Sequence, residues 1–137
     1  MKLPILTRDD LIQASRKDAL IVETAQQIIK DFAEFGLDVT FSGIPGHFYE
    51  ELYGQMRQHI LQLSEESTTR FQALLYRIDV SQRDIDLYHR QQPEANYMDV
   101  LTELIIHREI KKVLVRDYFR SHNPTQPLAS DLSDEED

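Results

Sequence analysis

The apolar residues of this chain recur mostly at intervals of three or four, the spacing that places side chains on one face of an α-helix. The clearest example runs from His47 to Asp79, a segment with one glycine and no proline. A helix with one apolar face has to bury it against other helices, so the pattern predicts an all-α fold. The residues of this face are Leu52, Met56, Ile60, Leu63, Phe71, Leu74 and Ile78.

A polar stretch at residues 64–69 leaves two arrangements open for this segment. The chain can turn there into a helical hairpin, or it can continue as one helix. We favour one helix over residues 47–79, because the apolar spacing keeps its phase across the stretch and neither glycine nor proline interrupts it. Such a helix has a length of about 50 Å.

An earlier helix is predicted from Thr7 up to Gly36. Thr7 and Asp10 resemble a capping box, and Gly36 stands where many helices end in a left-handed glycine. Ser15 and Asp18 offer an alternative start that would split this segment near Ser15, and we favour a continuous helix. Five polar residues are expected to face away from its apolar stripe, namely Glu23, Gln27, Lys30, Asp31 and Glu34.

A connector follows over residues 37–46 and ends in a turn cluster rich in glycine and proline. After the long helix, Ser81 and Asp84 together form the cap of a predicted short helix. Pro93 lies just beyond the expected end of this helix, where its ring prevents continuation. The sequence therefore predicts one short helix between two long ones.

Asn96 caps the last predicted helix, which runs to about Ser121 before Pro124 ends it. Residues 123–137 carry five of the nine net negative charges and few apolar side chains, so a disordered acidic tail is expected there. The predicted architecture is an up-down bundle of three long helices and one short helix over residues 1–122, followed by this tail.

The composition excludes several kinds of protein. The chain of 137 residues contains no cysteine, which rules out a disulfide scaffold, thiol catalysis and cysteine-ligated zinc. Neither a signal peptide nor a run of about 20 apolar residues is present, so we expect a cytoplasmic protein without membrane attachment. The net charge of −9 repels a phosphate backbone, which disfavours nucleic acid as a partner.

The sequence gives little support for catalysis or for a bound cofactor. The five histidines are scattered over different segments, and the Glu-x-x-His repeat of di-iron bundles is missing. The nucleophile motif Gly-x-Ser-x-Gly is also missing. We therefore assign no catalytic residue, no metal ligand and no cofactor. The pattern favours a protein that is not an enzyme, without deciding the point.

The last helix carries the most unusual charged residue. Arg108 projects from the middle of an apolar face, Lys111 and Lys112 flank it, and His107 is adjacent. One interpretation is a recessed cationic site for a carboxylate or phosphate. The other, which we favour, is that Arg108 pairs with an internal acid. Asp18 is the hypothetical partner, because it lies in phase with the apolar stripe of the first helix.

Aromatic residues gather around the first connector. Phe41, Tyr49 and Tyr53 could line a small-ligand pocket together with the Arg108 cluster, although core packing is the commoner role of such a group. A second feature of the last helix is a cation at every fourth position (Arg108, Lys112, Arg116 and Arg120). This stripe could meet nucleic acid or the chain's own acidic tail, or it could simply complement the helix dipole.

No motif is specific enough to assign the chain to a family. The function that the sequence favours is that of a small, non-catalytic interaction or scaffold protein that acts through a helix face on a protein partner or on a second copy of itself. The alternative is a small-ligand or anion-binding protein, including a minor enzyme, with its site between the aromatic connector and the Arg108 cluster.

Overall fold

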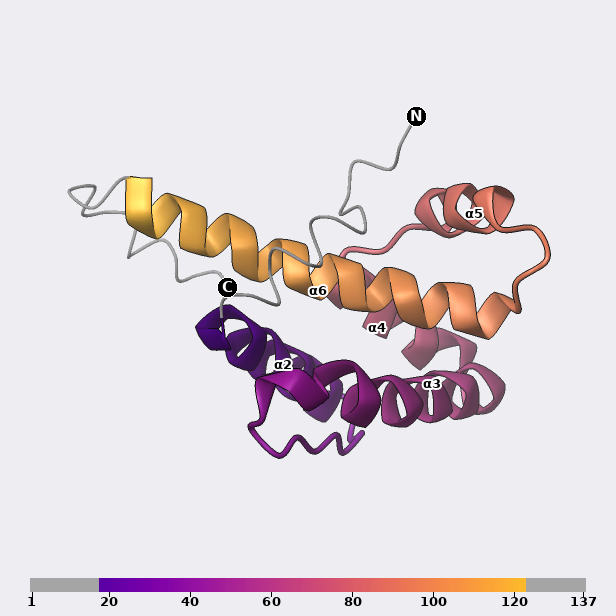
Figure 1. Cartoon of the computed structure of the whole chain (residues 1–137). Coiled ribbons are helices and arrows are strands. Elements are labelled where there is room, and N and C mark those ends of the chain that lie inside the picture. Colours follow the sequence, from indigo (N-terminus) through magenta and orange to yellow (C-terminus); the bar gives the residue numbers. More distant parts are fainter. Residues whose placement is uncertain (1–17, 123–137) are drawn as a thin grey trace.

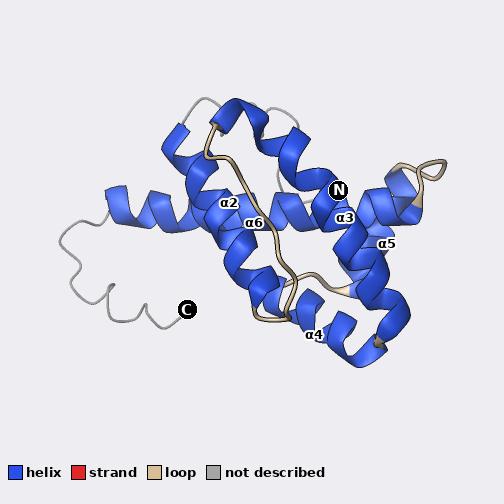
Figure 2. Ribbon diagram, turned by 90° about the horizontal axis from the view of Figure 1, so that it is seen from below, coloured by secondary structure: helices blue, strands red, loops and turns tan. Residues whose placement is uncertain are grey.

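The computed structural model describes residues 18–122, and all regular structure within them is helical (Figure 1, Figure 2). The prediction of an all-α fold is therefore confirmed. The elements are α2 (Asp18–Ala33), the 3₁₀ turn η1 (Pro45–His47), α3 (Phe48–Glu66), α4 (Thr68–Ile78), α5 (Gln82–Gln91) and α6 (Tyr97–His122).

Helix α6 is the central element of the described fold. It contacts α2, α3, α4 and α5, and Figure 1 shows it crossing the molecule with α2 and α3 on one side and α5 on the other. Its N-terminal three-quarters is mostly buried, whereas its C-terminal end extends past the other helices. The low amphipathicity of the α6 sequence follows from this position, because several of its faces meet other helices.

The segment that we predicted as one helix over residues 47–79 is a helical hairpin, so the prediction of a single helix is wrong. Ser67 adopts an extended conformation (φ −157°, ψ 107°), and its side chain accepts a hydrogen bond from the Arg70 amide. Serine competes well for this role at a helix start, because its hydroxyl satisfies an otherwise free amide. Helices α3 and α4 then fold back on each other. The described chain therefore has five α-helices rather than four.

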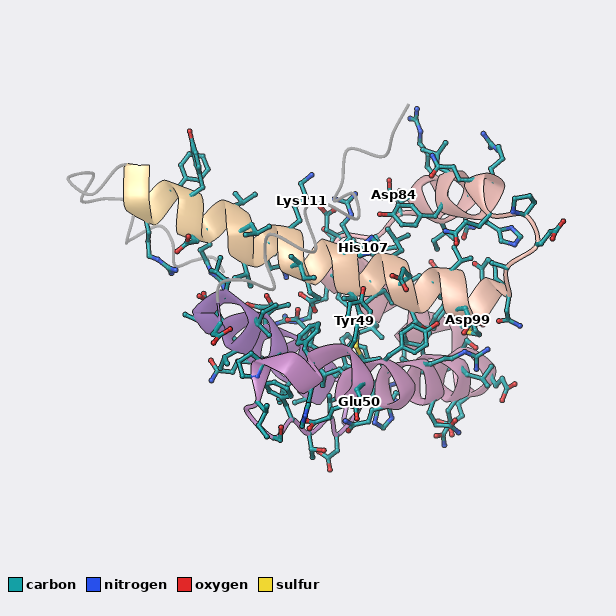
Figure 3. All side chains as sticks on the ribbon, viewed as in Figure 1. Tyr49, Glu50, Asp84, Asp99, His107 and Lys111 are labelled. Carbon is teal, nitrogen blue, oxygen red and sulfur yellow. The ribbon has the colours of Figure 1, made fainter. Side chains whose placement is uncertain are left out.

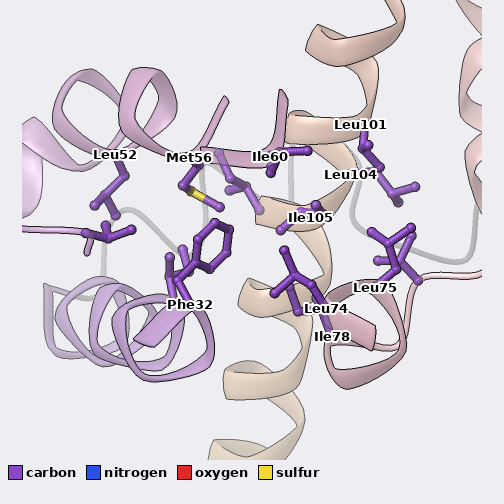
Figure 4. Close-up of a cluster of buried hydrophobic side chains, with 14 of the residues drawn as sticks. Phe32, Leu52, Met56, Ile60, Leu74, Leu75, Ile78, Leu101, Leu104 and Ile105 are labelled. Carbon is purple, nitrogen blue, oxygen red and sulfur yellow. The ribbon is translucent and has the colours of Figure 1, made fainter. Parts of the chain in front are cut away.

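The hydrophobic core joins α6 to the other helices (Figure 4). Phe32 of α2 and Met56 of α3 are fully buried, as are Leu104 and Ile105 of α6. The apolar face predicted from the spacing is also buried at Leu52, Met56, Ile60, Leu63, Leu74 and Ile78. Because α3 and α4 share this face across the turn at Ser67, the stripe stays in phase although the helix does not continue.

Three predicted helix caps are confirmed. Gly36 has a positive φ of 73°, and the Leu37 and Gly36 amides donate to the Phe32 and Ala33 carbonyls, which is the Schellman pattern. Ser81 and Asp84 form a complete capping box at the start of α5. The amides of Met98 and Asp99 donate to the Asn96 side chain at the start of α6.

Asp79 ends α4 in the left-handed conformation that normally favours glycine, with φ 67°. We expect Asp79→Gly to raise the free energy of unfolding by about 1 kcal/mol, because the strain of the side chain at this φ disappears. Chemical denaturation monitored by circular dichroism measures this change. Exposed Asp86, in the middle of α5, is the control, because Asp86→Gly at a right-handed position should instead lower stability by about 1 kcal/mol.

Several predictions concern residues outside 18–122. The helix start at Thr7, the break near Ser15 and the acidic tail over residues 123–137 all lie there, and the division into a bundle over residues 1–122 and a tail stays a prediction. Among the described helices, none combines the length and the apolar character needed to cross a lipid bilayer.

Candidate functional site

Arg108, the residue singled out by the sequence, pairs with an internal acid. Its Nη2 lies 2.8 Å from Oδ2 of Asp84, and both side chains are mostly buried. Burial alone raises the pKa of the Asp84 carboxyl, but the bonds from Arg108 and the Ser81 amide outweigh it and lower that pKa. The proposed partner Asp18 is wrong, because Asp18 is exposed at the start of α2 and Arg108 is directed at α5.

Lys112 takes part in a second buried cluster, centred on Asp31 of α2. The Asp31 side chain is 1% exposed. Its Oδ1 accepts hydrogen bonds from Arg77 Nε of α4 (2.9 Å) and Gln27 Nε2 (3.1 Å), and its Oδ2 lies 3.4 Å from Lys112 Nζ. Our expectation that Asp31 faces solvent is therefore wrong. This carboxylate connects three helices.

Glu109 completes this cluster and is itself fully buried. Burial raises its pKa well above the usual value, and the hydrogen bond and negative charge of Asp31 raise it further. The pKa of Asp31 is lowered instead: burial raises it, but hydrogen bonds from Glu109, Gln27 and Arg77 and the charge of Lys112 outweigh that effect. Asp31 and Glu109 thus form an acid pair in which the pKa of Asp31 is lowered and the pKa of Glu109 is raised.

The cationic stripe of α6 faces a matching polar stripe of α2. Arg116 donates to Gln27 Oε1 and to Glu23 Oε2, both at 3.1 Å, and Arg120 lies 3.5 Å from Glu23 Oε1. We call this contact the α2–α6 seam, formed by Glu23, Gln27 and Asp31 of α2 and by Lys112, Arg116 and Arg120 of α6. We expected Glu23 and Gln27 to face away from the packed side of α2. That expectation is also wrong, because both side chains contact α6.

His107 lies in a chain of polar side chains between α5, α6 and α3. The Tyr88 hydroxyl is 3.0 Å from His107 Nδ1, and Glu103 Oε2 is 3.4 Å from His107 Nε2. The Tyr49 hydroxyl donates to Glu103 Oε2 (3.1 Å), and Figure 3 shows Tyr49 between α3 and α6. The hydrogen bond from His107 lowers the pKa of Glu103, whereas burial raises the pKa of the Tyr49 hydroxyl.

The remaining predicted site residues lie apart from one another. Tyr53 donates to Asp99 Oδ1 (2.9 Å), and burial raises its pKa to about 12. Phe41 packs edge-on against Phe48. Lys111 points away from α2 and α3 (Figure 3). A surface depression of about 370 Å³ is lined by Asp18, Ile21, Pro45, Gly46, Phe48, Tyr49 and Ile110.

The structure therefore separates the residues that we grouped into one ligand site. Tyr49 and His107 are brought together through Glu103, whereas Arg108 turns to α5 and Lys112 turns to α2. Among the described residues that line the depression beside Tyr49, none is lysine or arginine.

An exposed apolar surface remains at the C-terminal end of α6. Val115 is 44% exposed and Phe119 is 56% exposed, and the spacing of four places both on one face. Tyr118 is also half-exposed and contacts the Phe119 ring edge-on. We call Val115, Tyr118 and Phe119 the α6 end patch. Figure 1 shows this part of α6 near the C-terminal end of the helix, close to the start of α2.

Within residues 18–122, no group of three or more histidine and carboxylate side chains could hold a metal ion. Comparisons with protein-family models, with curated proteins and with solved structures each find no match.

Proposed function

We propose that this protein is a non-catalytic interaction module that self-associates through the α6 end patch. The observation that carries the proposal is the exposure of Val115 and Phe119 on a helix in which Arg108, Lys112, Arg116 and Arg120 are paired with carboxylates. Large apolar side chains that share one exposed helix face favour contact with another apolar helix face.

The paired cations support this function over the alternative of an anion site. Arg108, Lys112, Arg116 and Arg120 each lie within 4 Å of a carboxylate of the same chain. A phosphate or nucleic acid would have to displace those carboxylates and would leave them without partners. The acidic residues of the predicted tail would meet the same obstacle, because they would have to displace these carboxylates to bind the cations of α6.

A second copy of the chain is the partner that fits the α6 end patch. Two antiparallel α6 ends related by a two-fold axis bring the same apolar face together, because the spacing of three and four residues is self-complementary. The patch contains three side chains, so the area buried is small and the association is weak and reversible.

Phe119→Ser is expected to abolish this self-association. Sedimentation or light scattering of the unmodified chain should show the mass rising from 16.1 kDa towards twice that value as concentration approaches about 1 mM, where contacts worth about 4 kcal/mol are populated. The matched control is Tyr76→Ser, because Tyr76 is 88% exposed on α4, away from α6. Only Phe119→Ser should hold the mass at the monomer value.

Two results would contradict the proposal. The first is an unmodified chain that stays monomeric over this concentration range, because the proposed self-association would then not occur. Equal dimer formation by Phe119→Ser and the unmodified chain would show that another surface makes the contact. Circular dichroism of both variants, with unchanged helix content, excludes unfolding as the cause of a mass change.

A further inference from the structure

Hydrogen-bond donors are distributed unequally between Asp31 and Glu109. Both Asp31 oxygens accept bonds from Arg77, Gln27 or Lys112. Both Glu109 oxygens are buried, and neither accepts a hydrogen bond from a donor within residues 18–122. The Lys112 ammonium lies 3.8 Å from Glu109 Oε1, which is outside hydrogen-bond distance. A buried carboxylate without donors is costly, whereas a neutral acid can donate its own proton to Asp31.

The charges around the acid pair balance when Glu109 is neutral. Arg77 contacts Asp31 and also lies 3.7 Å from Glu34, and Lys112 contacts Asp31. Among residues 18–122, two cations therefore face the Asp31 and Glu34 carboxylates, and a charged Glu109 would have to share Lys112 with Asp31. One proton held between Asp31 and Glu109 keeps the cluster neutral.

The other helices supply no further cation to this cluster. On the α5 side, Asp84 faces Arg108, the residue next to Glu109. On the α3 side, Tyr49 faces Glu103 and Tyr53 faces Asp99. These groups satisfy one another, so within residues 18–122 the groups that act on Glu109 are Asp31 from α2, Arg77 from α4 and Lys112 from its own helix.

The acid pair is connected to the exposed end of α6 by the seam. Gln27 donates to Asp31 and accepts from Arg116, and Arg116 and Arg120 both contact Glu23. The contacts of Arg116 and Arg120 join α6 to α2. The bond from Gln27 to Asp31 lies within α2 and orients the Gln27 side chain towards Arg116. Gln27 therefore links the acid pair to the part of α6 that carries Val115 and Phe119.

We propose that the α2–α6 seam is a proton-controlled latch: one proton shared by Asp31 and Glu109 holds the C-terminal half of α6 against α2, and release of that proton to water lets this half separate. In the closed form the Glu109 O–H donates to Asp31. In the open form the O–H bond is broken, the proton has left for water, and two carboxylates that repel each other are exposed to solvent.

The direction of the pH dependence follows from the raised pKa of Glu109 in the folded chain. A group with a raised folded pKa contributes stability that is fully present below its unfolded pKa, 4.5 for glutamate. That contribution is lost as pH rises from 4.5 towards the folded pKa. In this window the opening equilibrium of the seam should rise about tenfold per pH unit.

Glu109→Gln tests the latch, because glutamine keeps the shape and the hydrogen bond to Asp31 but cannot release a proton. Amide hydrogen exchange is measured from about pH 5 to about pH 8 and corrected for the intrinsic exchange rate. In the unmodified chain, protection of residues 113–120 should fall as pH rises, by about tenfold per pH unit up to the folded pKa of Glu109, whereas protection of residues 100–106 should change less. In Glu109→Gln, both segments should keep constant protection.

Glu103→Gln is the matched control, because Glu103 lies on the same helix but belongs to the Tyr49–His107 chain. This variant should keep the pH dependence of residues 113–120. Carboxyl ¹³C NMR of selectively labelled glutamate provides a measurement that needs no variant, and the Glu109 signal should titrate above 4.5. A Glu109 signal that titrates at or below 4.5, or equal pH dependence in Glu109→Gln and the unmodified chain, overturns the latch. Exchange at low protein concentration separates this result from self-association.

Discussion

Replacement of Phe32 with alanine is expected to lower the free energy of unfolding by about 4 kcal/mol. Phe32 is fully buried between α2 and α3, and Figure 4 shows its ring within the cluster that contains Met56 and Ile60. Deletion of the ring removes its buried apolar contacts and leaves a cavity that the close-packed helices cannot fill completely. Urea denaturation of the purified variant measures the loss.

Phe119→Ala is the control for this prediction, because Phe119 is the same residue type in an exposed position. Its removal should lower the free energy of unfolding by less than about 1 kcal/mol. A cost for Phe32→Ala no larger than that for Phe119→Ala would show that α2 does not pack on the core as described.

The second large effect is expected for Asp31→Ala, which should lower the free energy of unfolding by about 2 to 3 kcal/mol. Removal of one partner from a buried ion pair costs about 3 to 5 kcal/mol. Solvent reaches about a third of Arg77 and of Lys112 and reduces that cost. Denaturation near neutral pH measures the change, and circular dichroism before unfolding shows whether the variant keeps its helix content.

Glu23→Ala is the matched control at the exposed end of the seam. Glu23 contacts Arg116 and Arg120, whose side chains are about half-exposed, so its removal should cost about 1 kcal/mol or less. Similar costs at Asp31 and Glu23 would contradict the central role that we assign to the buried end of the seam.

The parts of the fold that the sequence predicted correctly depend on local interactions. Gly36, Ser81 and Asn96 each act within one helical turn, through a positive φ or a side chain that accepts from nearby amides. The burial of Met56 and Leu74 follows from spacing within a helix. Such features need no knowledge of which helix packs against which.

The turn at Ser67 shows why helix length was harder to predict. Ser67 would have a helical backbone conformation inside one long helix, and it has an extended conformation at the start of α4. The apolar residues have the same spacing in both cases, so the spacing does not distinguish them. The hairpin forms because α3 and α4 pack against each other and against α6, which is a tertiary effect. Ser67 followed by Thr68 and Thr69 was the available local signal.

The acid pair was missed for a different reason. Asp31 lies on the polar side of α2, so the apolar pattern alone places it in solvent, and only the approach of α6 and α4 buries it. Glu109 did carry a signal. It stands three or four positions from Ile105, Ile106 and Val113, and a carboxylate among such residues indicates a buried acid that needs a partner.

Two cations of the predicted ligand site lie apart from its aromatic residues, because Arg108 is close to the Asp84 carboxylate and Lys112 is close to the Asp31 carboxylate. Arg108 was correctly expected to pair with an acid, but that acid is Asp84, in the cap of α5, and no helix periodicity relates the two residues. The repeat of cations along α6 was visible in the sequence, and its matching partners at Glu23, Gln27 and Asp31 became clear only when α2 was placed beside it.

The position of α6 at the end of the described fold has a consequence for folding during synthesis. Helices α2 to α5 leave the ribosome before α6 has been made, yet each of them packs against α6. The apolar surface that α6 covers on these helices therefore stays exposed during synthesis, where it can bind chaperones or other nascent chains. The fold is complete only after α6 has been synthesised. A chain truncated before Tyr97 should therefore be collapsed and prone to aggregation and should not form a smaller bundle.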